Sequence, residues 1–133
     1  MSALTSSWTP RILGLLRIVT GYLLLTHGTA KILGFPKVDM FANLQISSIY
    51  GIAGILELVL GALLVIGLFS RFAAFIASGL CAFAYFIGHA SASTIATPIL
   101  NGGETAVLFC FAFLYLAFAG PGPWSVDAGR GKA

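Results

Sequence analysis

Four apolar stretches, each about as long as a membrane-crossing helix, make up most of this 133-residue sequence. They cover residues 12–30, 49–69, 72–89 and 103–120. A helix needs about 20 mostly apolar residues to cross the hydrocarbon core of a bilayer. Only 8% of the residues are charged and 59% are hydrophobic, whereas soluble domains carry about 25% charged residues. The sequence therefore predicts an all-α membrane protein and excludes a soluble enzyme domain, a disordered tail and a disulfide-stabilised scaffold.

The breaks between the stretches are short, which predicts a four-helix transmembrane up-down bundle in a single domain, residues 1–133. Pro10 comes just before the first stretch, and Pro121 and Pro123 follow the last, where proline suits helix boundaries. Lys and Arg residues are more numerous on the side that would hold both termini, which predicts an N-in, C-in orientation. Residues 33–48 mix apolar and polar side chains, so we expect this segment to lie in the membrane interface.

The expected topology places most polar side chains at the outer ends of the helices, around an outward-facing polar pocket. No catalytic residue is assigned. The net charge is +3, but the basic residues are scattered, so no nucleic-acid partner is expected. The candidate binding and proton-handling residues are Arg17, His27, Lys31, Glu57, Tyr85, His89, Asn101 and Glu104.

Arg17 and Glu57 lie inside apolar stretches, where an ionisable side chain costs several kcal/mol unless it is paired or faces a wet cavity. Each belongs to a stripe of glycines at helical spacing, which lets helix backbones approach closely. In antiparallel helices their depths would differ by roughly 7 Å. We expect a structural ion pair that fixes the helix register. The alternatives are that Glu57 carries protons or contacts a quinone headgroup, or that the two residues do not meet.

The histidines and cysteines suggest weaker alternatives. His27 and His89 could ligate haem from two parallel helices, or a transition metal together with Glu104. Interfacial histidines are more often hydrogen-bonded and solvated, so neither haem nor a metal is expected. Cys81 and Cys110 should lie at similar depth on neighbouring helices. Because the chain lacks a Cys-x-x-Cys motif, we expect both to pack as small apolar residues, with a thiol–disulfide role as the alternative.

Several segments carry a family resemblance. Arg17 comes first, followed by residues 27–36, which read His-Gly-Thr-Ala-Lys-Ile-Leu-Gly-Phe-Pro; together they resemble the corresponding part of the DoxX family, with its His-Gly-x-x-Lys-x-x-Gly-Phe-Pro segment. Gly-Ile-Leu-Glu at 54–57 and Gly-Leu-Phe-Ser-Arg at 67–71 are similar to that family's second helix and following turn. Asn-Gly-Gly-Glu at 101–104 and Gly-Pro-Gly-Pro-Trp-Ser-Val-Asp at 120–127 are similar to the start of its fourth helix and its C-terminal signature. The candidates that match these motifs are Arg17, His27, Lys31, Glu57, Asn101 and Glu104.

The resemblance implies a multi-pass protein of the bacterial inner membrane. The family is named for its similarity to the membrane subunit of an archaeal thiosulfate:quinone oxidoreductase, and some members are linked to oxidative or thiol stress. It implies no general set of catalytic residues.

The leading functional hypothesis is a membrane subunit, not a complete enzyme alone, that serves a quinone-linked or thiol-redox system. Quinone is then the expected ligand, and a membrane or peripheral redox partner would supply electrons, because about 130 residues leave no room for a flavin domain. One alternative is a non-enzymatic scaffold or assembly factor. Another is a small-solute or proton transporter, which would have to form a homo-oligomer because the chain lacks inverted repeats.

Overall fold

The computed structural model describes residues 2–132 and contains helices but no β-strand within that part of the chain. Four long helices dominate it: α1 (Ala3–Ile32), α2 (Ile49–Ile66), α3 (Ser70–Ala84) and α5 (Glu104–Ala119). A π-helical turn, η2 (Tyr85–His89), continues α3 without a break. The short elements are η1 (Asp39–Phe41), α4 (Pro98–Asn101) and α6 (Val126–Gly129). The expectation of an all-helical chain is confirmed for these residues.

Three helices are long and apolar enough to cross a membrane: α1, α2 and the continuous Ser70–His89 helix formed by α3 and η2. The fourth, α5, is apolar but has only 16 residues. Helices that could span a membrane, judged by length and composition, therefore make up much of the described chain, as the hydropathy of the sequence predicts.

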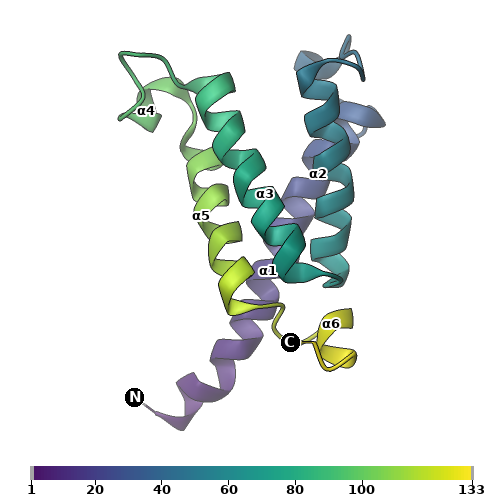
Figure 1. Ribbon diagram of the computed structural model, residues 1–133, viewed down its shortest axis with the longest axis vertical. Helices are drawn as coiled ribbons and strands as arrows, with labels where there is room; N and C mark the ends of the chain where they lie inside the picture. Colours follow the sequence, from purple (N-terminus) through teal and green to yellow (C-terminus); the bar gives the residue numbers. More distant parts are fainter. Residues whose placement is uncertain (1, 133) are drawn as a thin grey trace.

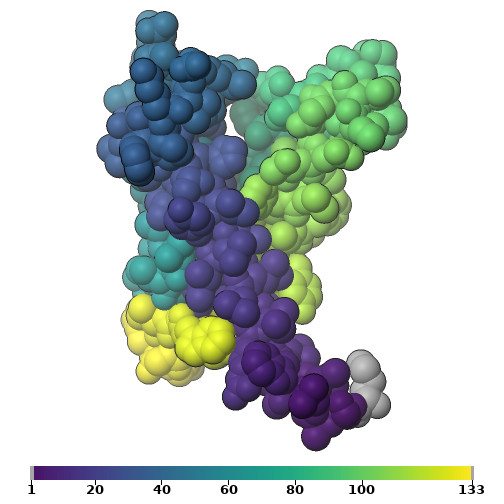
Figure 2. All heavy atoms as spheres, turned by 180° about the vertical axis from the view of Figure 1, so that it is seen from behind, coloured from purple at the N-terminus to yellow at the C-terminus, as the bar shows by residue number. Residues whose placement is uncertain are grey.

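The helices form two antiparallel pairs rather than one evenly closed bundle. α1 packs along α2, and α3 packs along α5 (Figure 1). The pairs converge near the turn between α2 and α3 and separate toward the ends that carry η1 and α4 (Figure 1). Viewed from behind, the atoms around η1 and those around α4 stand apart with a hollow between them (Figure 2).

Glycines allow α1 and α2 to lie almost backbone to backbone. A Cβ atom added to Gly28 would come within 2.4 Å of the backbone nitrogen of Leu58, and one added to Gly61 within 2.5 Å of that of Leu25. Both distances are far below any real carbon contact, so only glycine fits at these positions. The stripes of small residues seen in the sequence therefore form the interface of this pair.

The core where the pairs meet combines large side chains with very small ones. Leu64, Phe113 and Leu116 fill it from α2 and α5, while the alanines of α3 let the other helices approach. The buried core residues are Leu24, Leu60, Leu64, Ala73, Ala74, Ala77, Cys81, Phe113 and Leu116. This packing holds the pairs together at one end and leaves them free to diverge at the other.

Two helix limits differ from those that the sequence pattern predicts. α1 begins at Ala3, so Pro10 lies inside it rather than before it. The hydroxyls of Thr5 and Thr9 donate to carbonyls three or four residues earlier, and Pro10 interrupts the ladder only in an exposed turn. α2 ends at Ile66, because Gly67 and Phe69 take left-handed conformations, with φ of 73° and 51°, and turn the chain directly into α3.

Candidate functional site

A cavity of about 750 Å³ lies between the two helix pairs, on the side where they diverge. Every long helix and the segment around η1 contribute to its wall, which is mainly apolar. The lining residues are Leu24, His27 and Lys31; Met40, Phe41 and Leu44; Ile49, Tyr50, Ala53 and Glu57; Leu80, Cys81, Phe83, Ala84, Ile87, Gly88 and His89; and Gly102, Thr105, Ala106 and Phe109. Apolar walls with a few polar groups are typical of small-molecule sites.

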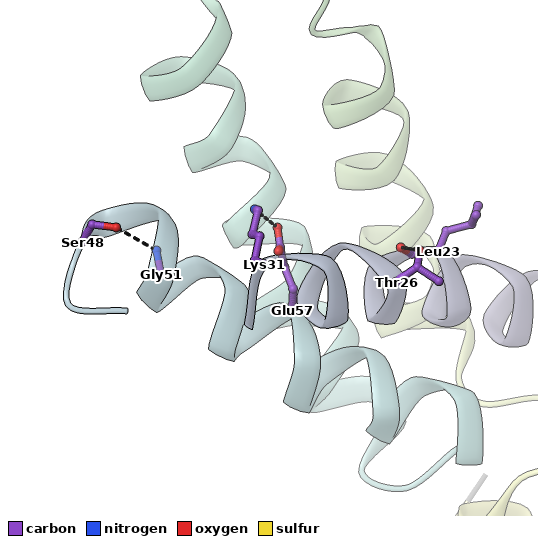
Figure 3. Close-up of polar contacts among 6 residues, drawn as sticks. All are labelled: Leu23, Thr26, Lys31, Ser48, Gly51 and Glu57. Atoms are coloured by element: carbon purple, nitrogen blue, oxygen red, sulfur yellow. Dashed lines mark hydrogen bonds and ion pairs between the residues drawn. The ribbon is translucent and has the colours of Figure 1, made fainter. Parts of the chain in front are cut away.

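One ion pair forms the charged part of this wall. The ammonium of Lys31 lies 2.9 Å from Oε1 of Glu57, and each side chain is only 11% exposed (Figure 3). The second carboxylate oxygen, Oε2, is buried and has no hydrogen-bond partner among the described residues. The aromatic ring of Phe41 covers Lys31, with its centroid 5.4 Å from Nζ. The pair is therefore held in a largely apolar setting, where charge–charge interactions are strong.

Local sequence places the pair. The hydroxyl of Ser48 accepts a hydrogen bond from the amide of Gly51 at 3.1 Å and so caps the start of α2 (Figure 3). Gly54 leaves room for the alkyl chain of Lys31, because a Cβ atom there would come within 2.9 Å of the Cβ of Lys31. Lys31 can therefore lie across α2 and reach Glu57, which is one turn of helix further on.

A second polar network borders the cavity at η2. The buried hydroxyl of Tyr85 donates to the carbonyl of Ile95 at 2.9 Å and accepts from Nδ2 of Asn101 at 3.2 Å. Nδ1 of His89 lies 3.2 Å from the carbonyl oxygen of Asn101. Asn101 also accepts from the amide of Gly103. These bonds fix the connection between η2 and α5, and with it the rim beside His89.

Comparison with known proteins identifies the family of this chain. The DoxX family model matches residues 12–90, which is more than half of the chain. The chain belongs to the DoxX family. An uncharacterised protein of Haemophilus influenzae is 43% identical over 120 residues, which cover 89% of this chain and 90% of the relative. No solved structure matches. The resemblance inferred from the motifs is thus confirmed, and together with the apolar helices it makes the chain a DoxX membrane protein.

Within this DoxX protein, the eight candidate residues divide into three groups. His27, Lys31, Glu57 and His89 line the cavity. Tyr85 and Asn101 form the network beside it. Arg17 and Glu104 are absent from its lining, and Glu104 is exposed at the start of α5.

The expected ion pair between Arg17 and Glu57 is wrong. Glu57 pairs with Lys31, fourteen residues after Arg17 and about 21 Å further along α1. Arg17 is fully buried and donates to five backbone carbonyls, at 2.6 to 3.2 Å. Those of Leu64 and Val65 belong to the last turn of α2, and the others follow α5: Pro121, Pro123 and Trp124. Arg17 therefore links α1 to the last turn of α2 and to the segment after α5, and it does not line the cavity.

The residues considered for a metal do not come together. No group of three or more His, Cys, Asp or Glu side chains suited to hold a metal occurs within residues 2–132. His27 and His89 line the same cavity from different helix pairs, and Glu104 is absent from that lining. Cys81 is buried in the cavity wall, whereas Cys110 is half-buried and its carbonyl accepts from the hydroxyl of Ser78 at 2.7 Å.

Reasoning from the sequence missed one feature of the cavity wall and one of the turn between α2 and α3. Phe41 and Met40, in the segment expected at the interface, form part of the cavity wall. Asp127 is buried and caps α3, accepting from the amides of Phe69 and Ser70. One signal was available: Asp127 is one of only four acidic residues in the chain.

Proposed function

We propose that this DoxX protein is a membrane subunit of a quinone-linked redox system and binds a quinone in the cavity between its helix pairs. The observation that supports the proposal best is an apolar cavity of about 750 Å³ whose wall contains one mostly buried ion pair. A quinone matches this wall, because it combines an apolar body with polar oxygens on its head group. Lys31 is the natural donor to a head oxygen, and His27 or His89 the natural group to exchange protons at the rim.

The shape of the cavity also favours a lipid-soluble ligand. The two helix pairs separate at this end of the molecule (Figure 1), and the large side chains on their outer faces, such as Ile52 and Leu108, are exposed and apolar. A ligand dissolved in the bilayer could enter between the pairs without crossing a polar barrier. A small hydrophilic solute would have to leave water for an apolar wall, which is unfavourable.

We propose four crossings of the bacterial inner membrane, with both termini in the cytoplasm. α5 would extend about 24 Å at 1.5 Å per residue, somewhat less than a hydrocarbon core of about 30 Å. A modest mismatch of this kind is accommodated by local thinning of the bilayer. The segment between α1 and α2 carries exposed Phe35 and Met40, which suit the membrane interface.

The protein would depend on a partner for electrons. Residues 2–132 form helices around a ligand cavity. A membrane or peripheral redox protein is therefore the expected donor.

The test is ligand-dependent stabilisation of the purified protein in detergent or nanodiscs. A ligand that binds the folded state at 100 times its Kd stabilises it by about 2.7 kcal/mol. We expect a short-chain ubiquinone to raise the Tm of the wild type. Ala106→Phe, which fills the cavity from α5, should abolish the shift.

Leu108→Phe is the matched control, because Leu108 is 72% exposed and is not part of the cavity lining. It should retain the full shift in Tm. If no ubiquinone or naphthoquinone, in either its oxidised or its reduced form, shifts the Tm of the wild type, the proposal is refuted, and a scaffold role becomes the better explanation.

A further inference from the structure

The ion pair in the cavity wall has hydrogen-bonding capacity that the protein leaves unused. The ammonium of Lys31 has three N–H donors, and its one hydrogen bond within the described residues goes to Oε1 of Glu57. Oε2 of Glu57 is buried and accepts no hydrogen bond there. A buried carboxylate oxygen without a donor is costly, and more so because it is charged. The carboxylate of Glu57 therefore gains a hydrogen bond when a ligand that carries a donor binds in the cavity.

The geometry directs this unused capacity into the cavity. Glu57 and Lys31 both line it, and their side chains extend from α2 and α1 toward α3 (Figure 3). The two oxygens of a carboxylate are chemically equivalent, and rotation about the last side-chain bond exchanges them. Either oxygen of the Glu57 carboxylate can therefore be the one without a hydrogen bond. The neighbouring ammonium of Lys31 still has N–H groups that are not used in hydrogen bonds to the described residues.

We propose that the cavity selects the hydroxyl-bearing, reduced form of its ligand, a hydroquinone rather than a quinone. This inference rests on the proposed function. A phenolic hydroxyl donates a hydrogen bond to the carboxylate of Glu57 and accepts, on its oxygen, a hydrogen bond from the ammonium of Lys31. A quinone carbonyl can only accept, so it satisfies Lys31 and leaves the carboxylate unpartnered.

The other polar groups of the wall do not remove this preference. His27, His89, Tyr50 and Thr105 lie in exposed positions, so their polar atoms are not shut off inside the protein as the carboxylate of Glu57 is. Glu57 is the buried acceptor of the lining, and its exposed fraction is only 9%. Sites built to hydrogen-bond a ligand hydroxyl reject analogues that lack it, because the polar group of the site is then left unpaired.

The experiment compares three ligands on the full-length protein in nanodiscs. They are a short-chain ubiquinol kept reduced under argon, the corresponding ubiquinone, and the ubiquinol with both hydroxyls capped as methyl ethers. We expect the ubiquinol to bind about tenfold or more tightly than either of the others. Equal affinity of the ubiquinol and its dimethyl ether would overturn the inference while leaving the proposed function intact.

Variants locate the selectivity at the ion pair. Glu57→Gln keeps the shape but replaces the charged acceptor, so the ratio of ubiquinol to ubiquinone affinity should fall close to one. Glu104→Gln, on an exposed acid outside the cavity lining, should keep the wild-type ratio. If Glu57→Gln does not fold, the comparison of three ligands on the wild type decides the inference alone. Absence of binding for all three would instead refute the proposed function.

Discussion

The carboxylate of Asp127 accepts a hydrogen bond from the backbone amide of Ser70 at 2.8 Å, so the C-terminal segment caps the start of α3. Its other oxygen accepts from the amide of Phe69 at 3.0 Å, and its own amide donates to the carbonyl of Gly67 at 2.9 Å. Phe69 has a φ of 51°, which is unfavourable for a bulky residue. Asp127 thus stabilises a strained turn between α2 and α3 from a position 57 residues away.

Asp127→Asn should therefore destabilise the protein and reduce its sensitivity to acid. Burial alone would raise the pKa of Asp127, but hydrogen bonds from Ser70 and Phe69 and the charge of Arg130 hold this pKa below its ordinary value. The stabilisation is complete above the ordinary pKa of about 3.9 and is lost as the pH falls through the lowered native pKa. Asparagine keeps one acceptor oxygen but turns an NH2 group toward the second amide, so we expect a loss of about 1–2 kcal/mol at pH 7, the cost of a buried donor left without an acceptor.

Thermal unfolding in detergent, followed by circular dichroism at pH 7 and at acid pH, measures both effects. The variant should lose less additional stability between the two pH values than the wild type does. Glu104→Gln is the matched control, because Glu104 is an exposed acid, and its stability at pH 7 should equal that of the wild type. An Asp127→Asn protein as sensitive to acid as the wild type would show that another carboxylate dominates.

Arg17 stabilises the same region, because it donates to carbonyls in the last turn of α2, just before the chain turns into α3. Its planar guanidinium donates at once to α2 carbonyls and to the segment after α5. Lysine presents its donors from a single atom and cannot reproduce this spread. Arg17→Lys should therefore cost about 3 kcal/mol or more of unfolding free energy, as expected when a buried charged network is broken.

The control for this change lies on the same helix. Arg11 is exposed, and its guanidinium carbon lies 5.1 Å from the centroid of the Trp8 ring, so Arg11→Lys keeps the charge and should alter stability by less than about 0.5 kcal/mol. Equal Tm values for Arg17→Lys and Arg11→Lys in the same detergent would contradict the role assigned to Arg17.

Double-mutant cycles distinguish the observed partner of Glu57 from the expected one. Lys31→Met and Glu57→Gln each break the 2.9 Å pair, so their effects on unfolding free energy should be non-additive by about 1 kcal/mol or more. Arg17→Lys and Glu57→Gln affect separate networks and should add to within about 0.5 kcal/mol. A larger coupling energy between Arg17 and Glu57 than between Lys31 and Glu57 would support the pairing expected from the sequence over the observed one.

The helices and the interface between α1 and α2 could be predicted from the sequence alone, but the partner of Glu57 could not. Hydropathy located the apolar helices, and the glycine stripes correctly identified the α1–α2 interface at Gly28 and Gly61. Arg17 and Glu57 were paired because both lie on glycine stripes and their expected depths differ by only roughly 7 Å. Depth does not fix the direction in which a side chain points around its helix.

The true partners of Arg17 were not visible in the sequence for a different reason. They are backbone carbonyls, which every residue has, so no residue type marks Leu64 or Pro121 as an acceptor. The cavity likewise depends on the divergence of two helix pairs, and the turn at Gly67–Phe69 and the cap by Asp127 set that geometry through tertiary contacts. Lys31 and Glu57 were both candidates in the sequence, but that they pair with each other could be seen only in the structure.

The contact between α1 and α2 gives a prediction with opposite signs at two glycines. Gly28→Ala would place a methyl group 2.4 Å from the backbone of Leu58, so the helices must separate, and we expect a loss of about 1–3 kcal/mol. Gly79, inside α3, has no atom within 4 Å of the same added carbon, so Gly79→Ala should stabilise the helix by up to about 1 kcal/mol. Unfolding free energies in one detergent compare the two directly. Because α1 carries Lys31 and α2 carries Glu57, Gly28→Ala should also lower the affinity for a bound quinol, which Gly79→Ala should leave unchanged. Tolerance of alanine at Gly28 with unchanged stability would show that the two helices pack less closely than described.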